Sequence, residues 1–143
     1  MADWSETPTW LMPSPTDEDR EFWEGARRGE LRIQRCNVCN KHQHYPRYLC
    51  SHCGADTHDL SFVTASGLGT IYSFTVIRKN GVPPLSERVP FVVAAIDLDE
   101  TGARILATMP TLSPHDARVG MRVQAAFRPI DDAIAFVDFQ AAE

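Results

Sequence analysis

The four cysteines of this 143-residue chain form two pairs, Cys36-x2-Cys39 and Cys50-x2-Cys53. A C-x2-C turn presents two thiolates on one tight loop, and two such turns supply the four soft donors of a tetrahedral Zn²⁺ site. The ten residues between the pairs are enough for a short hairpin that brings the two turns together. Because four thiolates fill the tetrahedron, we expect a structural zinc ribbon with no open position for a substrate.

Other interpretations of the cysteines are weaker. Disulfide frameworks are typical of exported proteins, but the acidic opening carries no export signal, so we expect reduced cysteines and a cytoplasmic location. A redox C-x-x-C would need one pair only, placed between a strand and a helix. His42, His44 and His52 lie close enough in sequence to compete as ligands. With four thiols available, we expect these histidines to be exposed or locally hydrogen-bonded.

Charge is distributed unevenly along the chain, whose formal net charge is −5. Residues 1–26 carry seven acids and one base, residues 27–59 carry six bases and three acids, and residues 60–143 carry nine acids and seven bases. A general nucleic-acid binder would show a broad basic footprint, and a membrane-spanning helix would need about 20 apolar residues in a row. We therefore expect no nucleic-acid partner and no membrane partner. A local basic patch could still hold a phosphate-bearing cofactor.

The elements that must position the cysteine pairs follow from hydrophobic patterning. A helix is expected over residues 17–28, with Thr16 as its N-cap and Gly29 at its end. Leu31 and Ile33 alternate with polar residues and predict a short strand that leads into the first pair. Beyond the second pair, segments rich in Val, Ile, Phe and Thr are separated by turn signals. The expected strands are residues 60–64, 68–78, 90–98, 103–109, 121–128 and 134–139.

This pattern predicts a mainly β protein in three parts. Several short strands within one segment suit a small closed barrel, for which the OB-fold is our preferred form. The run Gly67-Leu68-Gly69-Thr70 fits a first barrel strand that bends sharply. We expect an N-terminal tail and helix over residues 1–30, a zinc ribbon over residues 31–59, and an OB-fold barrel over residues 60–143.

The N-terminal part is unusually aromatic for its length. Trp4, Trp10, Phe22 and Trp23 offer more aromatic surface than a tail and a short helix easily hide. Aromatic side chains are common anchors of interfaces. We expect another chain to bury part of this surface.

Outside the cysteines, the sequence offers little that could catalyse a reaction. It contains no P-loop, no G-x-G-x-x-G, no G-x-S-x-G and no H-E-x-x-H. His115 stands next to Asp116 in a loop-like stretch, which is weak support for a catalytic dyad. We expect no catalytic residue and interpret the chain as a binding or assembly module. A single-stranded nucleic-acid binder is the alternative, with Tyr72 and Phe74 on one face of a strand as stacking residues or as core.

Six stretches of the chain carry a resemblance to a known family. They are Phe22-Trp23-Glu24-Gly25, Gln34-Arg35-Cys36, Cys50-Ser51-His52-Cys53-Gly54, Gly67-Leu68-Gly69-Thr70-Ile71-Tyr72-Ser73-Phe74-Thr75, Pro90-Phe91-Val92-Val93-Ala94 and Val119-Gly120-Met121-Arg122-Val123. Residues 17 to about 139 are similar to a bacterial and archaeal family long catalogued as a domain of unknown function. Its members join a rubredoxin-like zinc ribbon to an OB-fold and accompany thiolase-like enzymes. Asn40 replaces the glycine usual after the first cysteine pair, a change that Asn tolerates.

The resemblance implies a non-catalytic zinc-binding subunit of a thiolase-type acyl-CoA complex. A thiolase-like catalytic subunit would hold the catalytic Cys and His, and the present chain would join it in a hetero-oligomer and share CoA or acyl-CoA as a ligand. The candidate contacts to the CoA phosphates are Arg35, Lys41, Arg47, Arg78 and Lys79. The alternative partner is an aldolase or hydratase that acts on CoA esters such as those of sterol side chains.

Overall fold

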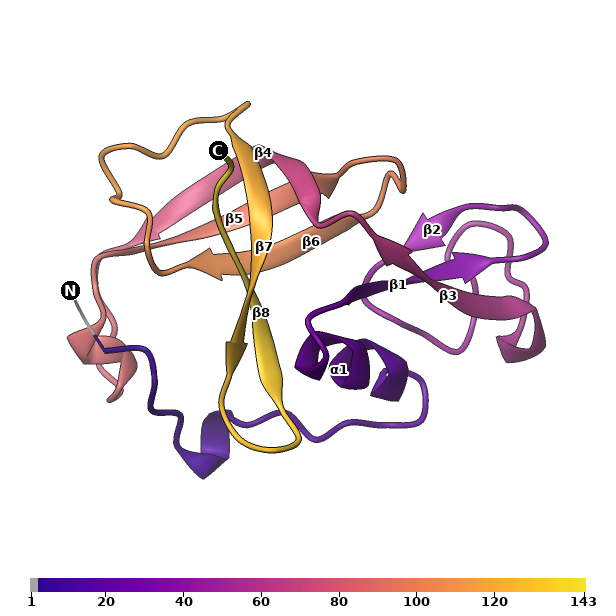
Figure 1. The fold of residues 1–143 in the computed structure, drawn as a ribbon, viewed down its shortest axis with the longest axis horizontal. Coiled ribbons are helices and arrows are strands. Elements are labelled where there is room, and N and C mark those ends of the chain that lie inside the picture. Colours follow the sequence, from indigo (N-terminus) through magenta and orange to yellow (C-terminus); the bar gives the residue numbers. More distant parts are fainter. Residues whose placement is uncertain (1–2) are drawn as a thin grey trace.

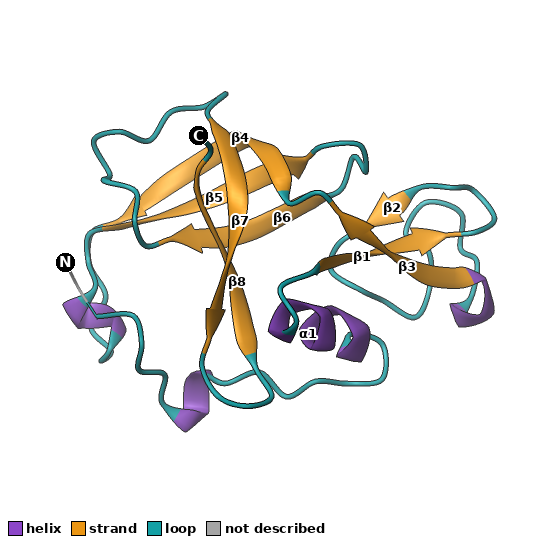
Figure 2. Cartoon of the chain, in the orientation of Figure 1, coloured by secondary structure: helices purple, strands orange, loops and turns teal. Residues whose placement is uncertain are grey.

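The computed structural model describes residues 3–143 as two antiparallel β-sheets and one α-helix (Figure 1, Figure 2). The elements are η1 (Thr9–Leu11), α1 (Arg20–Arg27), β1 (Leu31–Cys36), β2 (His42–Gln43), η2 (Thr57–Asp59), β3 (Leu60–Ala65), β4 (Leu68–Ile77), η3 (Leu85–Glu87), β5 (Phe91–Leu98), β6 (Arg104–Met109), β7 (Arg122–Pro129) and β8 (Ala135–Ala141). The architecture is mainly β with one helix, as predicted. Within these residues, no helix is long and apolar enough to cross a membrane.

The larger sheet has the strand order β6-β5-β4-β7-β8 and curls into a small barrel. Its outer strands, β6 and β8, approach each other without forming a ladder. One side-chain bond crosses between them, from Thr108 Oγ1 to Asp138 Oδ1 at 2.7 Å. The barrel is therefore partly open along this line, which we call the seam, and it has the five-stranded form of an OB-fold.

The barrel core explains why the first barrel strand carries a glycine. Ile71, Ile96 and Phe139 are almost fully buried inside the sheet. Gly69 lies where β4 pairs with β5 and β7 at once. A Cβ atom added at Gly69 would lie 2.7 Å from the carbonyl oxygen of Asp97 and 2.7 Å from Ile96 Cγ2. Glycine therefore permits the close approach that this part of the barrel requires.

The helix is shorter at its start than the sequence predicted. Asp19 Oδ1 accepts hydrogen bonds from the amide (2.6 Å) and the hydroxyl (3.1 Å) of Thr16, so Thr16 does not act as the expected side-chain cap. The other carboxylate oxygen of Asp19 accepts from the Tyr45 hydroxyl at 2.5 Å. These contacts hold residues 17–19 as a turn, and the helix begins at Arg20. Gly29, with a φ of 80°, follows the helix end as expected.

The smaller sheet, β2-β1-β3, lies beside the barrel. Its last strand, β3, leads directly into the first barrel strand, β4. β3 pairs with β1 along its whole length, although we expected this segment to belong to the barrel. Only Ser66 and Gly67 separate β3 from β4. The Glu100 carboxylate accepts from the Ser66 amide (2.9 Å) and hydroxyl (3.3 Å), and the Gly67 carbonyl accepts from the Ala125 amide (2.8 Å). The link between the two sheets is therefore short and fixed on both sides.

Residues 3–15, which we call the strap, lie on the barrel of the same chain. Arg88 donates to the carbonyl oxygens of Asp3 (3.1 Å) and Glu6, and Arg128 donates to the carbonyl oxygen of Trp4 (2.9 Å). Two cations that are distant in sequence thus anchor the start of the strap through its backbone.

The aromatic residues of the N-terminal part are largely covered by this chain itself. Phe22 is 4% exposed. Trp23 donates from Nε1 to the Tyr45 hydroxyl at 2.8 Å, and the ring of Trp4 stands edge-on to Phe91 at 5.1 Å. Phe22 therefore needs no other chain to cover it, whereas Trp10 remains 60% exposed, and burial of part of this surface by another chain stays a prediction.

Candidate functional site

The two cysteine pairs lie in turns of the same kind. In the first turn, the amide of Asn40 donates to the carbonyl oxygen of Cys36 at 2.9 Å. In the second, the amide of Gly54 donates to the carbonyl oxygen of Cys50 at 2.9 Å. Asn40 and Gly54 have φ angles of 63° and 81°, a left-handed conformation that these two residue types adopt most readily. The sequence thus builds the same sulfur-presenting turn twice.

The four sulfur atoms converge in a geometry that suits zinc. All of them lie within 4.8 Å of one another. Cys36 Sγ is 3.6 Å from Cys53 Sγ, and Cys39 Sγ is 3.6 Å from Cys50 Sγ. A tetrahedron with Zn–S bonds of about 2.3 Å has S···S edges of about 3.8 Å. The donor set and its spacing therefore fit a structural Zn²⁺ ion.

The three nearby histidines lie outside the sulfur cluster, which contains only cysteines within residues 3–143. His52 Nε2 is 3.3 Å from the carbonyl oxygen of His42, a local contact. The ring centre of His44 lies 5.0 Å from that of Phe22 and 5.2 Å from that of Tyr45. Burial lowers the pKa of His44 to about 4, so its imidazole is neutral near pH 7. Its Nδ1 atom is buried and has no hydrogen-bond partner among the described residues.

Two buried glutamines hold the hairpin between the cysteine turns. Gln43 Nε2 donates to Gln34 Oε1 at 2.6 Å, and Gln43 Oε1 accepts from the amide (2.7 Å) and hydroxyl (2.8 Å) of Ser51. Gln34 also donates to the carbonyl oxygen of Arg47 and accepts from its amide, both at 2.9 Å. These bonds satisfy backbone groups that the two-residue strand β2 leaves without a ladder partner. Sequence reasoning missed them, because a polar residue in an alternating strand carries no sign of burial.

The five cations proposed for phosphate contacts fall into two groups. Arg35, Lys41 and Arg47 lie in the zinc-ribbon part, whereas Arg78 and Lys79 follow the end of β4. That end of β4 lies on the opposite side of the barrel from the ribbon (Figure 1). Within the described chain, none of the five pairs with a carboxylate. Arg35 donates instead to two asparagine side chains, at 2.9 and 2.6 Å. The fold does not gather the five into a single cluster.

The strand that carries Tyr72 and Phe74 does not present both rings on one face. β4 holds an extra residue between Ile71 and Ser73 relative to β5, and this bulge turns Tyr72 outward. Tyr72 is 54% exposed, whereas Phe74 packs against the core. The guanidinium of Arg104 lies 3.5 Å from the centre of the Tyr72 ring and covers one face of it. The expectation of a shared face is therefore wrong.

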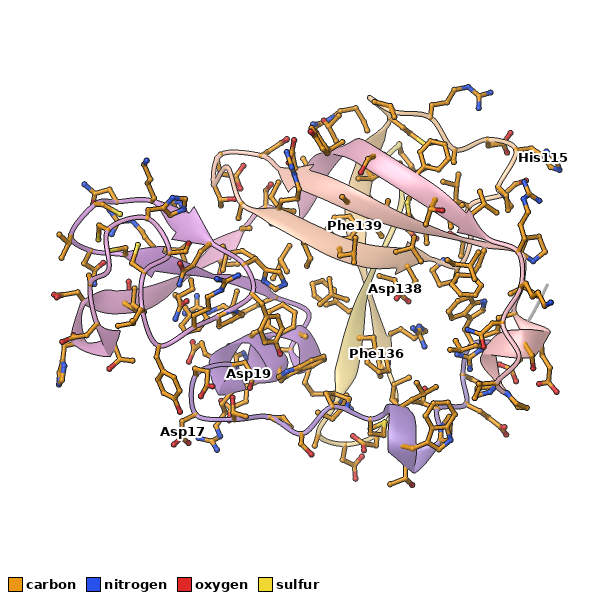
Figure 3. All side chains as sticks on the ribbon, turned by 180° about the vertical axis from the view of Figure 1, so that it is seen from behind. Asp17, Asp19, His115, Phe136, Asp138 and Phe139 are labelled. Atoms are coloured by element: carbon orange, nitrogen blue, oxygen red, sulfur yellow. The ribbon has the colours of Figure 1, made fainter. Side chains whose placement is uncertain are left out.

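His115 lies in the loop between β6 and β7, at the edge of the molecule (Figure 3). The hydrogen bonds of His115 in the described residues use its backbone, and no bond joins its ring to Asp116. Both side chains are exposed. The described geometry therefore does not support a catalytic dyad of His115 and Asp116.

Two cavities adjoin along the seam between β6 and β8. The first, about 300 Å³, lies between the strap and the barrel, and we call it the strap cavity. The second, about 380 Å³, lies between α1, His44 and the barrel. Both are lined by Leu106, Phe136 and Val137. Neither cavity was predictable from the sequence, because their walls come from segments that meet only in the folded chain.

Comparisons with known proteins agree with this architecture. Residues 23–59 match the family described as "ChsH2, rubredoxin-like zinc ribbon domain", and residues 62–128 match "ChsH2, C-terminal OB-fold domain". The solved structure titled "Ltp2-ChsH2(DUF35) aldolase" is 30% identical with a TM-score of 0.79, and the match covers 92% of this chain and 100% of that chain. The fold is therefore shared with a solved chain of similar extent.

Two relatives extend the comparison. The "Probable enoyl-CoA hydratase alpha subunit" of Thermomonospora curvata is 33% identical over 94% of this chain, which spans only 41% of that relative. The "DUF35 domain-containing scaffold protein" of Methanocaldococcus jannaschii is 33% identical over 68% of this chain and 67% of its own length. Together with the matched zinc-ribbon and OB-fold domains, these likenesses show that the chain belongs to the DUF35 family.

Proposed function

We propose that this chain is a zinc-binding, non-catalytic subunit that acts together with a separate catalytic chain on CoA thioesters. The observation that carries this proposal is the match to the whole of a chain in a solved aldolase, whose title names Ltp2 beside ChsH2(DUF35). A relative titled as an alpha subunit of an enoyl-CoA hydratase adds support. The assembly with a catalytic chain would be a hetero-oligomer.

The zinc site in this proposal is structural. Cys36, Cys39, Cys50 and Cys53 would hold the ion, and with four thiolates in place the ion has no vacant position for a substrate. Bound zinc supplies folding free energy to a small ribbon that has little apolar core of its own. The role of the cysteines is thus to fix the shape of the β2-β1-β3 sheet.

The names of the relatives favour a hydratase-type or aldolase-type partner over the thiolase-type partner that the sequence resemblance implied. The chain spans about two fifths of the hydratase subunit, so it corresponds to part of that protein only. We assign the hydratase or aldolase chemistry to the partner.

We further propose that the ribbon cations, Arg35, Lys41 and Arg47, contact the phosphates of CoA. Their charges have no carboxylate partner in the described residues, and they lie in one part of the fold. Arg78 and Lys79 lie at the far end of the barrel and do not belong to this group. Cations without a carboxylate partner suit the diphosphate and 3′-phosphate of a CoA molecule.

The test is purification of the tagged chain from its native host, followed by three assays on the chain alone and on any stoichiometric complex. The assays are hydration of an enoyl-CoA, retro-aldol cleavage of a β-hydroxyacyl-CoA, and thiolysis of a β-ketoacyl-CoA. We expect at least one activity in the complex and none in the isolated chain. Turnover by the isolated chain would refute the proposal, and so would a stable complex that is inactive on all three esters.

A further inference from the structure

The strap cavity combines an apolar wall with a cationic end. Its wall includes Leu11 of the strap, Leu85 of η3, Leu106 of β6 and Phe136 of β8. Leu106 is 71% exposed, which is a large apolar surface for a side chain in a concave site. At about 300 Å³, the cavity lies at the lower end of the range for small-molecule sites, roughly 300–1,000 Å³.

The cationic end carries a buried guanidinium without a carboxylate of its own. Arg88 is 5% exposed, and its Nε and Nη2 atoms donate to the backbone carbonyls of Asp3 and Glu6. Its Nη1 atom donates no hydrogen bond within residues 3–143, and the guanidinium lies over the Trp4 ring, 4.8 Å from its centre. The Asp3 carboxylate accepts from the amide (2.8 Å) and hydroxyl (2.6 Å) of Ser5 instead. Burial and the nearby charge of Arg128 lower the pKa of Arg88, and the carboxylates of Asp3, Glu87 and Asp138 only partly oppose this shift.

The second arginine at the cavity is already neutralised. Arg128 donates to the Asp138 carboxylate from Nε at 2.5 Å and from Nη2 at 3.2 Å. Figure 3 shows Asp138 and Phe136 on the same strand, β8, which lines the cavity. Thr7, another lining residue, has a buried hydroxyl without a hydrogen-bond partner in residues 3–143. One cation without a salt bridge and one unpaired hydroxyl in the described residues thus remain beside an apolar wall.

We propose that the strap cavity binds a small organic carboxylate with an apolar body. The carboxylate accepts hydrogen bonds from Arg88 Nη1 and the Thr7 hydroxyl, which gives the buried hydroxyl a partner and the guanidinium a counter-charge. The apolar body lies on Leu106 and Phe136 and removes the exposed face of Leu106 from water. The ligand is a single small molecule, because the cavity has a volume of only about 300 Å³ and the strap closes one side of it. This site is separate from the ribbon cations and does not depend on the proposed CoA-ester function.

The test uses the zinc-loaded full chain and sodium octanoate as the probe, with octan-1-ol as the matched neutral compound. Titration is followed by the backbone amide and tryptophan indole resonances in ¹H–¹⁵N NMR spectra. The variants are Leu106→Glu, which places a negative charge in the apolar wall, and Val119→Glu, at a residue that is 67% exposed and lies outside both seam cavities. Arg88→Gln is a third variant, read together with its melting temperature because Arg88 also anchors the strap.

We expect octanoate to bind saturably with a Kd on the order of 1 mM or tighter, and octan-1-ol to bind about tenfold or more weakly. The Trp4 indole and the amides of residues 85–88 should shift most. Leu106→Glu and Arg88→Gln should abolish saturation, and Val119→Glu should leave the Kd unchanged. Equal binding of the acid and the alcohol would overturn the proposal, as would undiminished binding by Leu106→Glu. No saturable shift with octanoate would overturn it as well.

Discussion

Cys53 is the exposed member of the sulfur cluster, whereas Cys36 and Cys50 are buried. Replacement of any of the four cysteines by Ser removes one donor of the tetrahedron. We expect Cys50→Ser to lower the zinc content from one ion per chain to nearly none and to unfold the β2-β1-β3 sheet, because metal binding is part of its folding free energy. Elemental analysis and amide NMR spectra check this.

The matched control for the zinc prediction is His52→Ala, which removes a nearby imidazole outside the sulfur cluster. This variant should keep one zinc ion and a folded ribbon. Full zinc content in Cys50→Ser, or loss of zinc from His52→Ala, would contradict the assigned ligand set.

His44 gives the chain a stability loss at acidic pH. Its pKa is about 4 in the folded chain and about 6.5 in an unfolded chain. The unfolded state therefore binds the proton more tightly, and stability that is complete above pH 6.5 falls as the pH drops toward 4, by up to roughly 3 kcal/mol. Protonation of the thiolates also releases zinc in acid, so the comparison must be between variants.

We expect His44→Phe to lose less stability than the unchanged chain between pH 7 and pH 5, measured by denaturant unfolding at constant zinc. NMR titration of the His44 ring should give a midpoint near 4. A midpoint near 6.5 for His44 would mean that its ring is solvated.

Charge reversal separates the two groups of candidate phosphate contacts. In an active complex, the combined Arg35→Glu and Lys41→Glu change should raise KM for the CoA ester about tenfold or more with a smaller effect on kcat, since phosphate contacts are remote from the reacting carbon. The matched control is Arg78→Glu with Lys79→Glu at the far end of the barrel. An equal rise of KM in both variants would indicate a general effect of charge rather than a site.

At the residue scale, the sequence predicts contacts that are local and misses those that are not. The cysteine turns were predictable because each ligand pair spans four residues and obeys a known spacing. Arg88 reaches the carbonyl oxygens of the strap across more than 80 residues. Gln34 and Gln43 meet only because β1 and β2 pair. No local pattern marks such partners before the chain is folded.

Among the elements, β4 depends on a glycine that admits no side chain. The Cβ atom of Gly69→Ala would lie 2.7 Å from the backbone oxygen of Asp97, so the strands must separate to admit it. We expect a loss of about 1–3 kcal/mol of unfolding free energy, as for other overpacked sites. The control is Gly81→Ala, where nothing lies within 4 Å of the added Cβ. Thermal and denaturant unfolding of both variants provide the measurement, and similar stabilities would contradict the prediction.

The strap has one tryptophan that packs on the barrel and one that does not. Trp4 is half-buried against Phe91, and Trp10 is 60% exposed. Trp4→Ala should lower the unfolding free energy by roughly 2–4 kcal/mol, close to the range for buried aromatic residues. Trp10→Ala should change it by less than about 0.5 kcal/mol. If Trp10→Ala destabilised the isolated chain as much as Trp4→Ala, the described packing of the strap would be wrong.

Element types were predictable because period-2 and period-3.6 patterns are local, and the strand boundaries match within one or two residues. The start of the helix was not predictable, because it depends on a hydrogen bond that the Asp19 carboxylate accepts from Tyr45, a residue beyond the following strand. The partner of β3 was also not predictable. The pattern of a short apolar strand indicates which of its faces is buried, but it does not indicate which of two sheets the strand joins.

At the scale of the whole molecule, α1 lies between the two sheets. It packs against β1 of the smaller sheet and β7 and β8 of the barrel. Arg27 of α1 also donates to the carbonyl oxygen of Asp132, in the turn between β7 and β8, at 3.2 Å. Composition and patterning predicted the helix, the zinc ribbon and the barrel, whereas the membership of β3 and the relative placement of the parts result from such long-range contacts. The helix and the short β3–β4 link therefore both hold the smaller sheet against the barrel.

The short β3–β4 link has a consequence for how the length of this chain can vary. Residues 78–90 and 110–121 cross the surface between barrel strands, so an inserted residue there can loop out into water. An insertion at Ser66 or Gly67 has no such outlet, because both residues are hydrogen-bonded and strands follow immediately on either side. It would rotate the zinc-bearing sheet against the barrel and pull β1 away from α1. Insertions and deletions during evolution should therefore be rarest at these two residues, which keep the distance and the orientation of the zinc ribbon relative to the barrel constant.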